Sequence, residues 1–200
     1  MISKLAKIIA HFFVKQNIAE SKHEAIYAYG MELLLSDVLN GLLALIIALV
    51  SGTVFPVLLF FTVFMILRRF SGGYHADTHW GCVLTMVVVM LIYCYGICNA
   101  PTEIVWFINI AFIVFSGISI FLLSPVAHPN KPVSEEKGKK LKVKSRIAYI
   151  SFSMTVMILY AVKMPMLSLY VASGIMLSAV AVLAGHISVQ RRACNETVES

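Results

Sequence analysis

The chain has 200 residues, of which 60% are hydrophobic and only 13% are charged, and its mean hydropathy is +0.87. Soluble domains carry about a quarter charged residues, so this composition excludes an ordinary soluble domain and indicates a helical bundle in lipid. The net charge of +6 is better explained by attraction to membrane lipid or to an acidic peptide than to nucleic acid, because no DNA- or RNA-binding motif is present.

The N-terminal segment, residues 1–28, is predicted to be amphipathic. A basic face and an apolar, aromatic face alternate at helical spacing, formed by Lys4, Lys7, His11 and Lys15 on one side and by Leu5, Ile8, Ile9, Phe12 and Phe13 on the other. This pattern is typical of an interfacial helix that lies on the membrane surface, and the alternative is a helix packed on the bundle. The lysines also interrupt any apolar core of a signal peptide.

The rest of the chain is dominated by apolar runs, at 33–50, 54–67, 82–99, 104–123, 147–162 and 166–186. A perpendicular crossing needs about 20 apolar residues, and several of these runs are shorter. We therefore expect an all-α, polytopic membrane helical bundle of about six transmembrane helices. Four spans with two re-entrant segments are the alternative.

The basic residues predict the orientation. All of the 16 Lys and Arg residues except Lys163 fall in the N-terminal segment, the window 68–81, the loop 124–146 or the C-terminal tail. Six alternating spans place these four regions on one side, which the positive-inside rule identifies as the cytoplasm, with both termini inside. Cys82 would then lie in a reducing compartment, and the four cysteines show no disulfide framework spacing.

The stretch RRFSGGYHADTHWGC, residues 68–82, holds the densest chemistry. Cys82 begins an apolar run, near an expected helix N-terminus whose N–H groups favour a thiolate. Histidine is the usual base for a thiol, and Gly72 and Gly73 allow another chain to approach closely. Residues 68–81 are therefore interpreted as a cytoplasmic catalytic loop. Cys82, which follows this loop directly, is the group that would attack a peptide carbonyl.

Spacing alone does not identify the base. In one continuous helix His79 would share a face with Cys82, whereas His75 would lie about 10.5 Å away along the axis, which slightly favours His79. If the segment is irregular and the helix starts nearer Trp80, His75 can fold back onto the thiol. Both histidines remain candidates on this ground.

Two other interpretations of the window do not involve a thiol nucleophile. His75, Asp77, His79 and Cys82 are all able to ligate zinc, but HADTHWGC lacks the paired spacing of known zinc sites, so no metal or other cofactor is expected. The simplest alternative is a set of interfacial polar residues beside a span, with Tyr74 and Trp80 as headgroup anchors.

The window resembles the signature of the accessory gene regulator B (AgrB) family, membrane cysteine endopeptidases of Gram-positive quorum-sensing systems. The family pattern has basic residues, Gly-Gly-x-His-Ala and a cysteine seven residues after the histidine, matched here by Gly72, Gly73, His75, Ala76 and Cys82. The segment YGMELLL at 29–35 and the proline-containing basic loop at 124–146 are also similar to the family. The resemblance thus covers nearly the whole chain, 1–200, as one domain.

The resemblance implies a peptidase that cleaves a short precursor peptide with an amphipathic half, a central Cys or Ser and an acidic tail. It selects His75 as the base and Cys82 as the nucleophile, with an acyl-enzyme thioester that can pass to the peptide's own side chain and form a thiolactone or lactone. Arg68, Arg69, Gly72 and Gly73 are the expected substrate contacts. The two arginines would attract the acidic tail, or they would only set the topology; a homodimer is compatible with these expectations.

Polar residues inside the first apolar run are a further signal. Asp37 and Asn40 stand three residues apart, with Glu32 at the entry, and such groups in a membrane mark function or hold helices together. Interhelical packing is the interpretation adopted here, and no third catalytic residue is assigned. A small peptide transporter or exporter is the competing function, although transporters tend to place polar residues at the midplane in paired halves.

Overall fold

The computed structural model describes residues 2–16, 18, 20–73, 79–126 and 135–199, and nearly all of them are helical. The α-helices are α1 (Ile2–Lys15), α2 (Glu24–Val50), α3 (Val54–Ser71), α4 (His79–Leu91), α5 (Val105–Leu123), α6 (Glu135–Ala161) and α7 (Pro165–Glu199). A π turn, Ile92–Gly96, and a short 3-10 turn, Ile97–Asn99, prolong α4. The predicted all-α architecture is confirmed.

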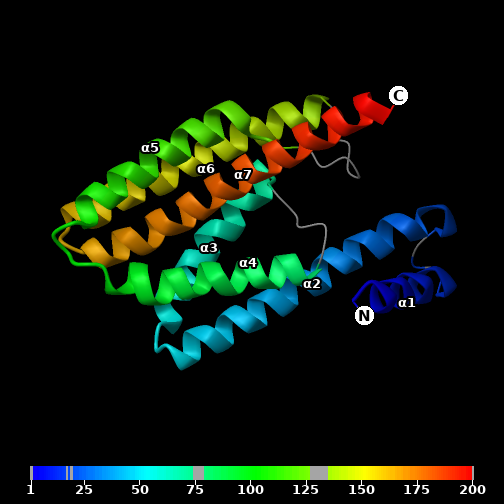
Figure 1. Cartoon of the computed structure of the whole chain (residues 1–200), viewed down its shortest axis with the longest axis horizontal. Helices are drawn as coiled ribbons and strands as arrows, with labels where there is room; N and C mark the ends of the chain where they lie inside the picture. Colours follow the sequence, from blue (N-terminus) through cyan, green and yellow to red (C-terminus); the bar gives the residue numbers. More distant parts are fainter. Residues whose placement is uncertain (1, 17, 19, 74–78, 127–134, 200) are drawn as a thin grey trace.

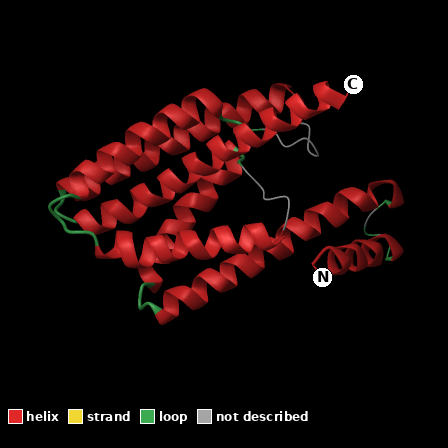
Figure 2. Cartoon of the chain, in the orientation of Figure 1, coloured by secondary structure: helices red, strands yellow, loops and turns green. Residues whose placement is uncertain are grey.

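Helices α2 to α7 run lengthwise between two ends of the molecule and alternate in direction (Figure 1). The loops that join α2 to α3, α4 to α5 and α6 to α7 gather at one end, drawn green on the left of Figure 2. The C-terminal end of α3, the start of α4 and both chain termini lie toward the opposite end. This second end therefore collects the segments that the sequence analysis predicted to be functional.

The core has two parts joined by α3. In the first, α3 packs with α5, α6 and α7 through a cluster of buried residues comprising Val63, Leu67, Ile120, Tyr149, Val156, Val171, Ala172 and Ile175. In the second, α3 packs with α2 and α4 through Ala44, Ala48, Val57, Phe60, Met90, Tyr93 and Cys94. Because α3 contributes to both clusters, it sets the position of the α2–α4 pair relative to the α5–α7 group.

The contact of α3 with α7 depends on Gly174. A Cβ built at this glycine would lie 2.7 Å from the carbonyl oxygen of Phe60 and 2.8 Å from Cβ of Val63. One turn along α7, the hydroxyl of Ser178 donates a hydrogen bond to the carbonyl oxygen of Phe64 at 3.4 Å. Helices in lipid gain no hydrophobic energy from one another, so close packing through small residues takes over that role.

Five helical segments are long and apolar enough to cross a membrane, within the ranges that the structure describes: Glu24–Val50, Val54–Ser71, Gly81–Asn99, Val105–Leu123 and Pro165–Arg191. A polytopic membrane bundle is therefore confirmed, whereas the count of six is not. The remaining predicted run, 147–162, lies in α6; it has 16 residues, and the basic residues Lys144 and Arg146 stand just before it. Even so, α6 runs beside α5 and α7 for most of their length (Figure 1).

Two predicted loops are shorter than expected. Helix α3 continues through Arg68–Ser71 and α4 starts at His79, so the predicted loop 68–81 is helical at both of its ends. The later half of the predicted loop 124–146, EEKGKKLKVKSR, could from its sequence form a short basic helix, and it is helical: α6 starts at Glu135 and continues into the bundle. Each helix extends past the point where the hydropathy changes.

The predicted amphipathic N-terminal helix is confirmed as α1, which packs on α2 (Figure 1). It does so through Ala6 and Ala10, both fully buried, while Ile8 and Phe12 remain 65% and 53% exposed. One face of α1 thus packs on the bundle, and its larger apolar side chains stay available to a lipid surface.

The close approach at Gly174 makes a direct test of this packing. We expect Gly174→Ala to lower the free energy of unfolding by about 1–3 kcal/mol, because the new methyl group meets α3 backbone. Gly41→Ala in α2, which has nothing within 4 Å of the added Cβ, is the control and should be neutral or slightly stabilising. Thermal unfolding of the purified protein in detergent measures both, and equal effects would contradict the proposed helix contact.

Candidate functional site

Cys82 lies in the first turn of α4, as the sequence predicted. Helix α4 starts at His79, so the thiol sits close to backbone N–H groups that have no partner within the helix and that favour a negative charge. The side chain is half-buried and the cysteine is free. Its position suits a nucleophile that a substrate can reach at one end of the bundle.

Within the described part of the chain, a polar side chain of α2 contacts this thiol. The side-chain amide Nδ2 of Asn40 donates a hydrogen bond to Sγ of Cys82 at 3.0 Å, and Asn40 is only 7% exposed. Its other atom, Oδ1, is buried and has no hydrogen-bond partner among the described residues. In the sequence Asn40 is an unusual polar residue within an apolar run, which predicts a packing contact between helices. Its partner, Cys82, is 42 residues away and cannot be identified from spacing.

A positive charge approaches the same corner from α3. Arg68 lies in the last turn of this helix, half-buried, with its guanidinium carbon 5.4 Å from the centre of the Phe64 ring. It interacts electrostatically with Asp37 of α2 and with Cys82 of α4. A neighbouring arginine favours the thiolate form of a cysteine, and Asp37 balances its charge inside an apolar bundle.

Arg69 differs from its neighbour in its surroundings. Consecutive residues of a helix point about 100° apart, and Arg69 is exposed whereas Arg68 turns toward α2 and α4. The two arginines that the sequence predicted as one substrate-binding pair therefore occupy different environments.

The diglycine is enclosed by this chain itself. Gly72 has a φ of 71° and a ψ of −154°, a region that is almost confined to glycine, and a Cβ there would clash with the carbonyl oxygen of Val126. The backbone N–H of Val126 donates to the carbonyl oxygen of Ser71 at 3.0 Å. A Cβ on Gly73, whose φ is 144°, would lie 3.1 Å from the carbonyl oxygen of Ala181 in α7. These glycines let the end of α3 dock on the segment after α5 and on α7.

The remaining predicted site residues are only partly placed. His75 and Asp77 lie outside the described residues, and His79 is the first residue of α4. The choice of His75 as the base therefore stays a prediction, as does substrate contact by Gly72 and Gly73. In the described part of the chain, no three His, Cys, Asp or Glu side chains lie close enough together to hold a metal ion.

The docking of the diglycine generates a prediction. Gly72→Ala should lower the free energy of unfolding by about 2–4 kcal/mol, because it combines a backbone conformation strained for alanine with a clash against Val126. Gly52→Ala, at a positive φ of 69° but with nothing within 4 Å, should cost only about 1–2 kcal/mol. Thermal unfolding in detergent compares the two, and a Gly72 variant as stable as the Gly52 variant would rule out the contact.

Comparisons with known proteins identify the family of this chain. The family model of Accessory gene regulator B matches residues 6–183. An AgrB-like protein of Clostridium perfringens strain SM101 is 26% identical over 187 residues, covering 90% of this chain and 86% of the relative. AgrB-like protein 2 of Clostridium perfringens strain 13 is 27% identical over 166 residues, covering 80% and 77%. Protein FsrB of Enterococcus faecalis is 25% identical over 119 residues, covering 60% of this chain and 49% of the relative.

No solved structure matches. Since the family model spans most of the sequence, the chain belongs to the AgrB family of accessory gene regulator quorum-sensing systems.

Proposed function

We propose that this protein is a membrane cysteine endopeptidase that cleaves a short quorum-sensing precursor peptide and helps to cyclise it. The observation that carries the proposal is the setting of Cys82. Its thiol lies in the first turn of a helix, accepts a hydrogen bond from Asn40 and interacts with the charge of Arg68. Each of these three influences favours the thiolate, which is the nucleophilic form of cysteine.

In the proposed first step, His75 takes the proton of Cys82, and Sγ attacks the carbonyl carbon at the junction between the peptide and its acidic tail. The C–N bond then breaks, the leaving amine receives the proton from His75, and the tail departs. The peptide remains attached to Cys82 as a thioester. This is the general course of covalent catalysis by a Cys–His pair.

In the proposed second step, the peptide's own Cys or Ser side chain attacks the thioester carbonyl and releases Cys82 as a thiol. The product is a cyclic thiolactone or lactone. Exchange of one thioester for another nearly conserves bond energy, so the reaction needs positioning more than a driving force. Exclusion of water at the membrane surface would disfavour hydrolysis of the intermediate.

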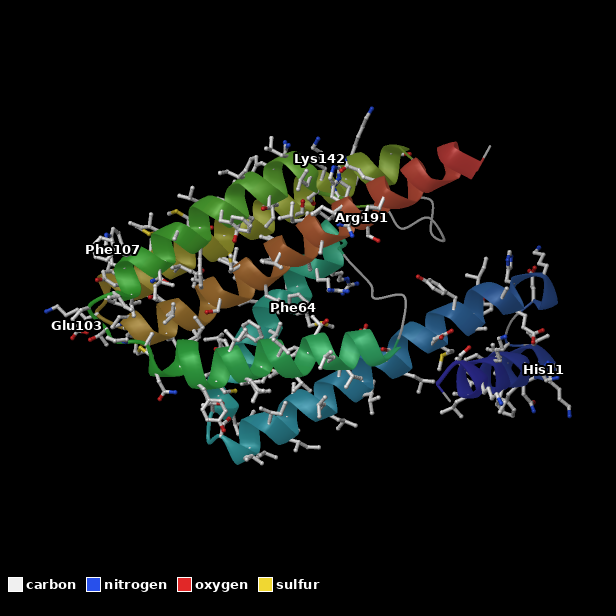
Figure 3. The ribbon with its side chains drawn as sticks, in the orientation of Figure 1. His11, Phe64, Glu103, Phe107, Lys142 and Arg191 are labelled. Atoms are coloured by element: carbon white, nitrogen blue, oxygen red, sulfur yellow. The ribbon has the colours of Figure 1, made fainter. Side chains whose placement is uncertain are left out.

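The distribution of charge supports an active site that faces the cytoplasm. Lys142 and Arg191 lie toward the same end of the bundle as the start of α4, whereas Glu103 and Phe107 lie at the other end (Figure 3). Lys139, Lys140, Lys142 and Lys144 in α6 are partly or fully exposed. By the positive-inside rule this end is the cytoplasmic one, with both termini inside.

The nucleophile and base are tested directly by substitution. Cys82→Ala and His75→Ala should each abolish processing of a co-expressed precursor, and His79→Ala should retain most of it. Cys98→Ala, which removes another half-buried thiol of the same helical segment, is the matched control and should also process normally. Mass spectrometry of the peptide products measures all four. Release of the tail by the Cys82 variant would show that the mechanism is wrong.

We expect Arg69 to bind the acidic tail of the precursor, because this arginine is exposed in the last turn of α3. Arg69→Gln should raise the precursor concentration needed for half-maximal cleavage by about two- to fivefold, the size of an exposed charge interaction. A precursor whose tail acids are replaced by amides should lose this dependence, and Lys163→Gln at the opposite end should show no effect. A similar change with both precursors would refute the charge pairing.

A further inference from the structure

Asn40 is a buried amide whose position packing does not explain. Its Nδ2 is directed at Cys82, and its Oδ1 has no partner within the described ranges. A leucine would join α2 to α4 in lipid without burying a polar group, since an unused acceptor in an apolar interior is costly. Among the described residues, the hydrogen bond that the amide makes is with the sulfur of the proposed nucleophile.

Asn40 is the donor of this hydrogen bond, and this direction determines its effect on the thiol. A donor aimed at Sγ stabilises the thiolate more than the thiol, because a hydrogen bond to a charged acceptor is about twice as strong as one to a neutral acceptor. The donor is held firmly, since Asn40 is 7% exposed and lies on the α2 face that packs against α4. The N–H group is thus in place before any substrate arrives.

At this corner the charge of Arg68 also favours the thiolate. Arg68 reaches it from α3 and Asp37 from α2, and Arg68 interacts with both Asp37 and Cys82. The charge of Asp37 is offset by Arg68, so it does not oppose an anion on the sulfur as an isolated carboxylate would. Asn40 supplies a direct hydrogen bond to Sγ in addition to the charge of Arg68.

We propose that Asn40 is a catalytic residue that stabilises the Cys82 thiolate by direct hydrogen bonding, an inference that rests on the proposed peptidase function. During activation the thiol proton moves to the base, and Asn40 keeps both protons of its amide. As Sγ forms its bond to the substrate carbonyl carbon, the negative charge leaves the sulfur. The hydrogen bond is therefore strongest in the free thiolate and holds Sγ at a fixed position for attack.

The test measures thiolate formation separately from peptide cleavage. The full-length protein in detergent is treated with iodoacetamide over a range of pH, and the alkylation rate of Cys82 is followed by site-resolved mass spectrometry. Asn40→Leu, which keeps the volume and removes the donor, should slow alkylation at pH 7 about tenfold and move its pH profile up by about one unit. Cleavage should fall by a similar factor in kcat, with little change in KM.

A buried amide in another part of the bundle provides the control. Asn109 of α5 is 1% exposed, its Nδ2 donates to the hydroxyl of Ser168 at 2.8 Å, and its Oδ1 also lacks a partner among the described residues. Asn109→Leu should affect the unfolding temperature much as Asn40→Leu does, yet leave the alkylation profile of Cys82 unchanged. A shift in both variants would show a general structural effect and overturn the proposal.

A second substitution keeps the test decisive if Asn40→Leu does not fold. Asn40→Asp has the same shape but places a carboxylate against Sγ, so alkylation at pH 7 should be slower than in the wild type and also slower than in the leucine variant. Alkylation as fast as in the wild type would overturn the proposal.

If Cys82-dependent cleavage occurs but Asn40→Leu changes neither the pH profile nor kcat, this inference fails while the peptidase function stands. If the alkylation profile shifts but the wild-type protein cleaves no precursor, the role of Asn40 in thiolate formation stands and the peptidase function fails.

Discussion

The contact between α3 and α7 at Gly174 determines how the two halves of the bundle meet. Because α7 has only a hydrogen atom at this point, the backbone of α3 comes close enough for Phe60 and Val63 to touch it. The same helix ends four residues after Leu67, a fully buried core residue, and its last turn carries Arg68 toward α2 and α4. The position of Arg68 beside the thiol thus depends on a packing contact between α3 and α7 farther along the bundle.

Polar contacts define the remaining helix positions. Asn109 bonds to Ser168 between α5 and α7, the hydroxyl of Ser124 donates to that of Ser145 at 3.0 Å, and the hydroxyl of Tyr149 donates to the carbonyl oxygen of Ile113 at 2.7 Å. Arg146, counted in the sequence as part of a basic loop, donates to the carbonyl oxygen of Phe121 at 2.9 Å. In lipid, such contacts and close-packed small residues give each helix pair a single register where apolar surfaces alone would not.

Much of the fold and the place of Cys82 at a helix start could be predicted from the sequence, because both depend on local signals. Apolar runs separated by basic segments predict a membrane bundle, and a cysteine at the start of such a run predicts a thiol at a helix N-terminus. The helix boundaries are harder to predict, because the hydropathy changes before a helix ends: α3 continues through Arg68–Ser71, and the basic segment after Glu135 belongs to the long helix α6. The pairing of Asn40 with Cys82 and the docking of Gly72 on Val126 join residues far apart in the chain, and spacing within one helix carries no information about such contacts.

The divergence of Arg68 and Arg69 has a consequence for how α3 can change. One residue inserted between Leu67 and Arg68 would leave the apolar contacts of Val63 and Leu67 in place but rotate the end of the helix by about 100°. The guanidinium now beside Cys82 would then turn away from it, and its neighbour would no longer point outward. The number of residues in α3 between its buried core contacts and its last turn therefore determines which arginine faces the thiol and which faces the surface.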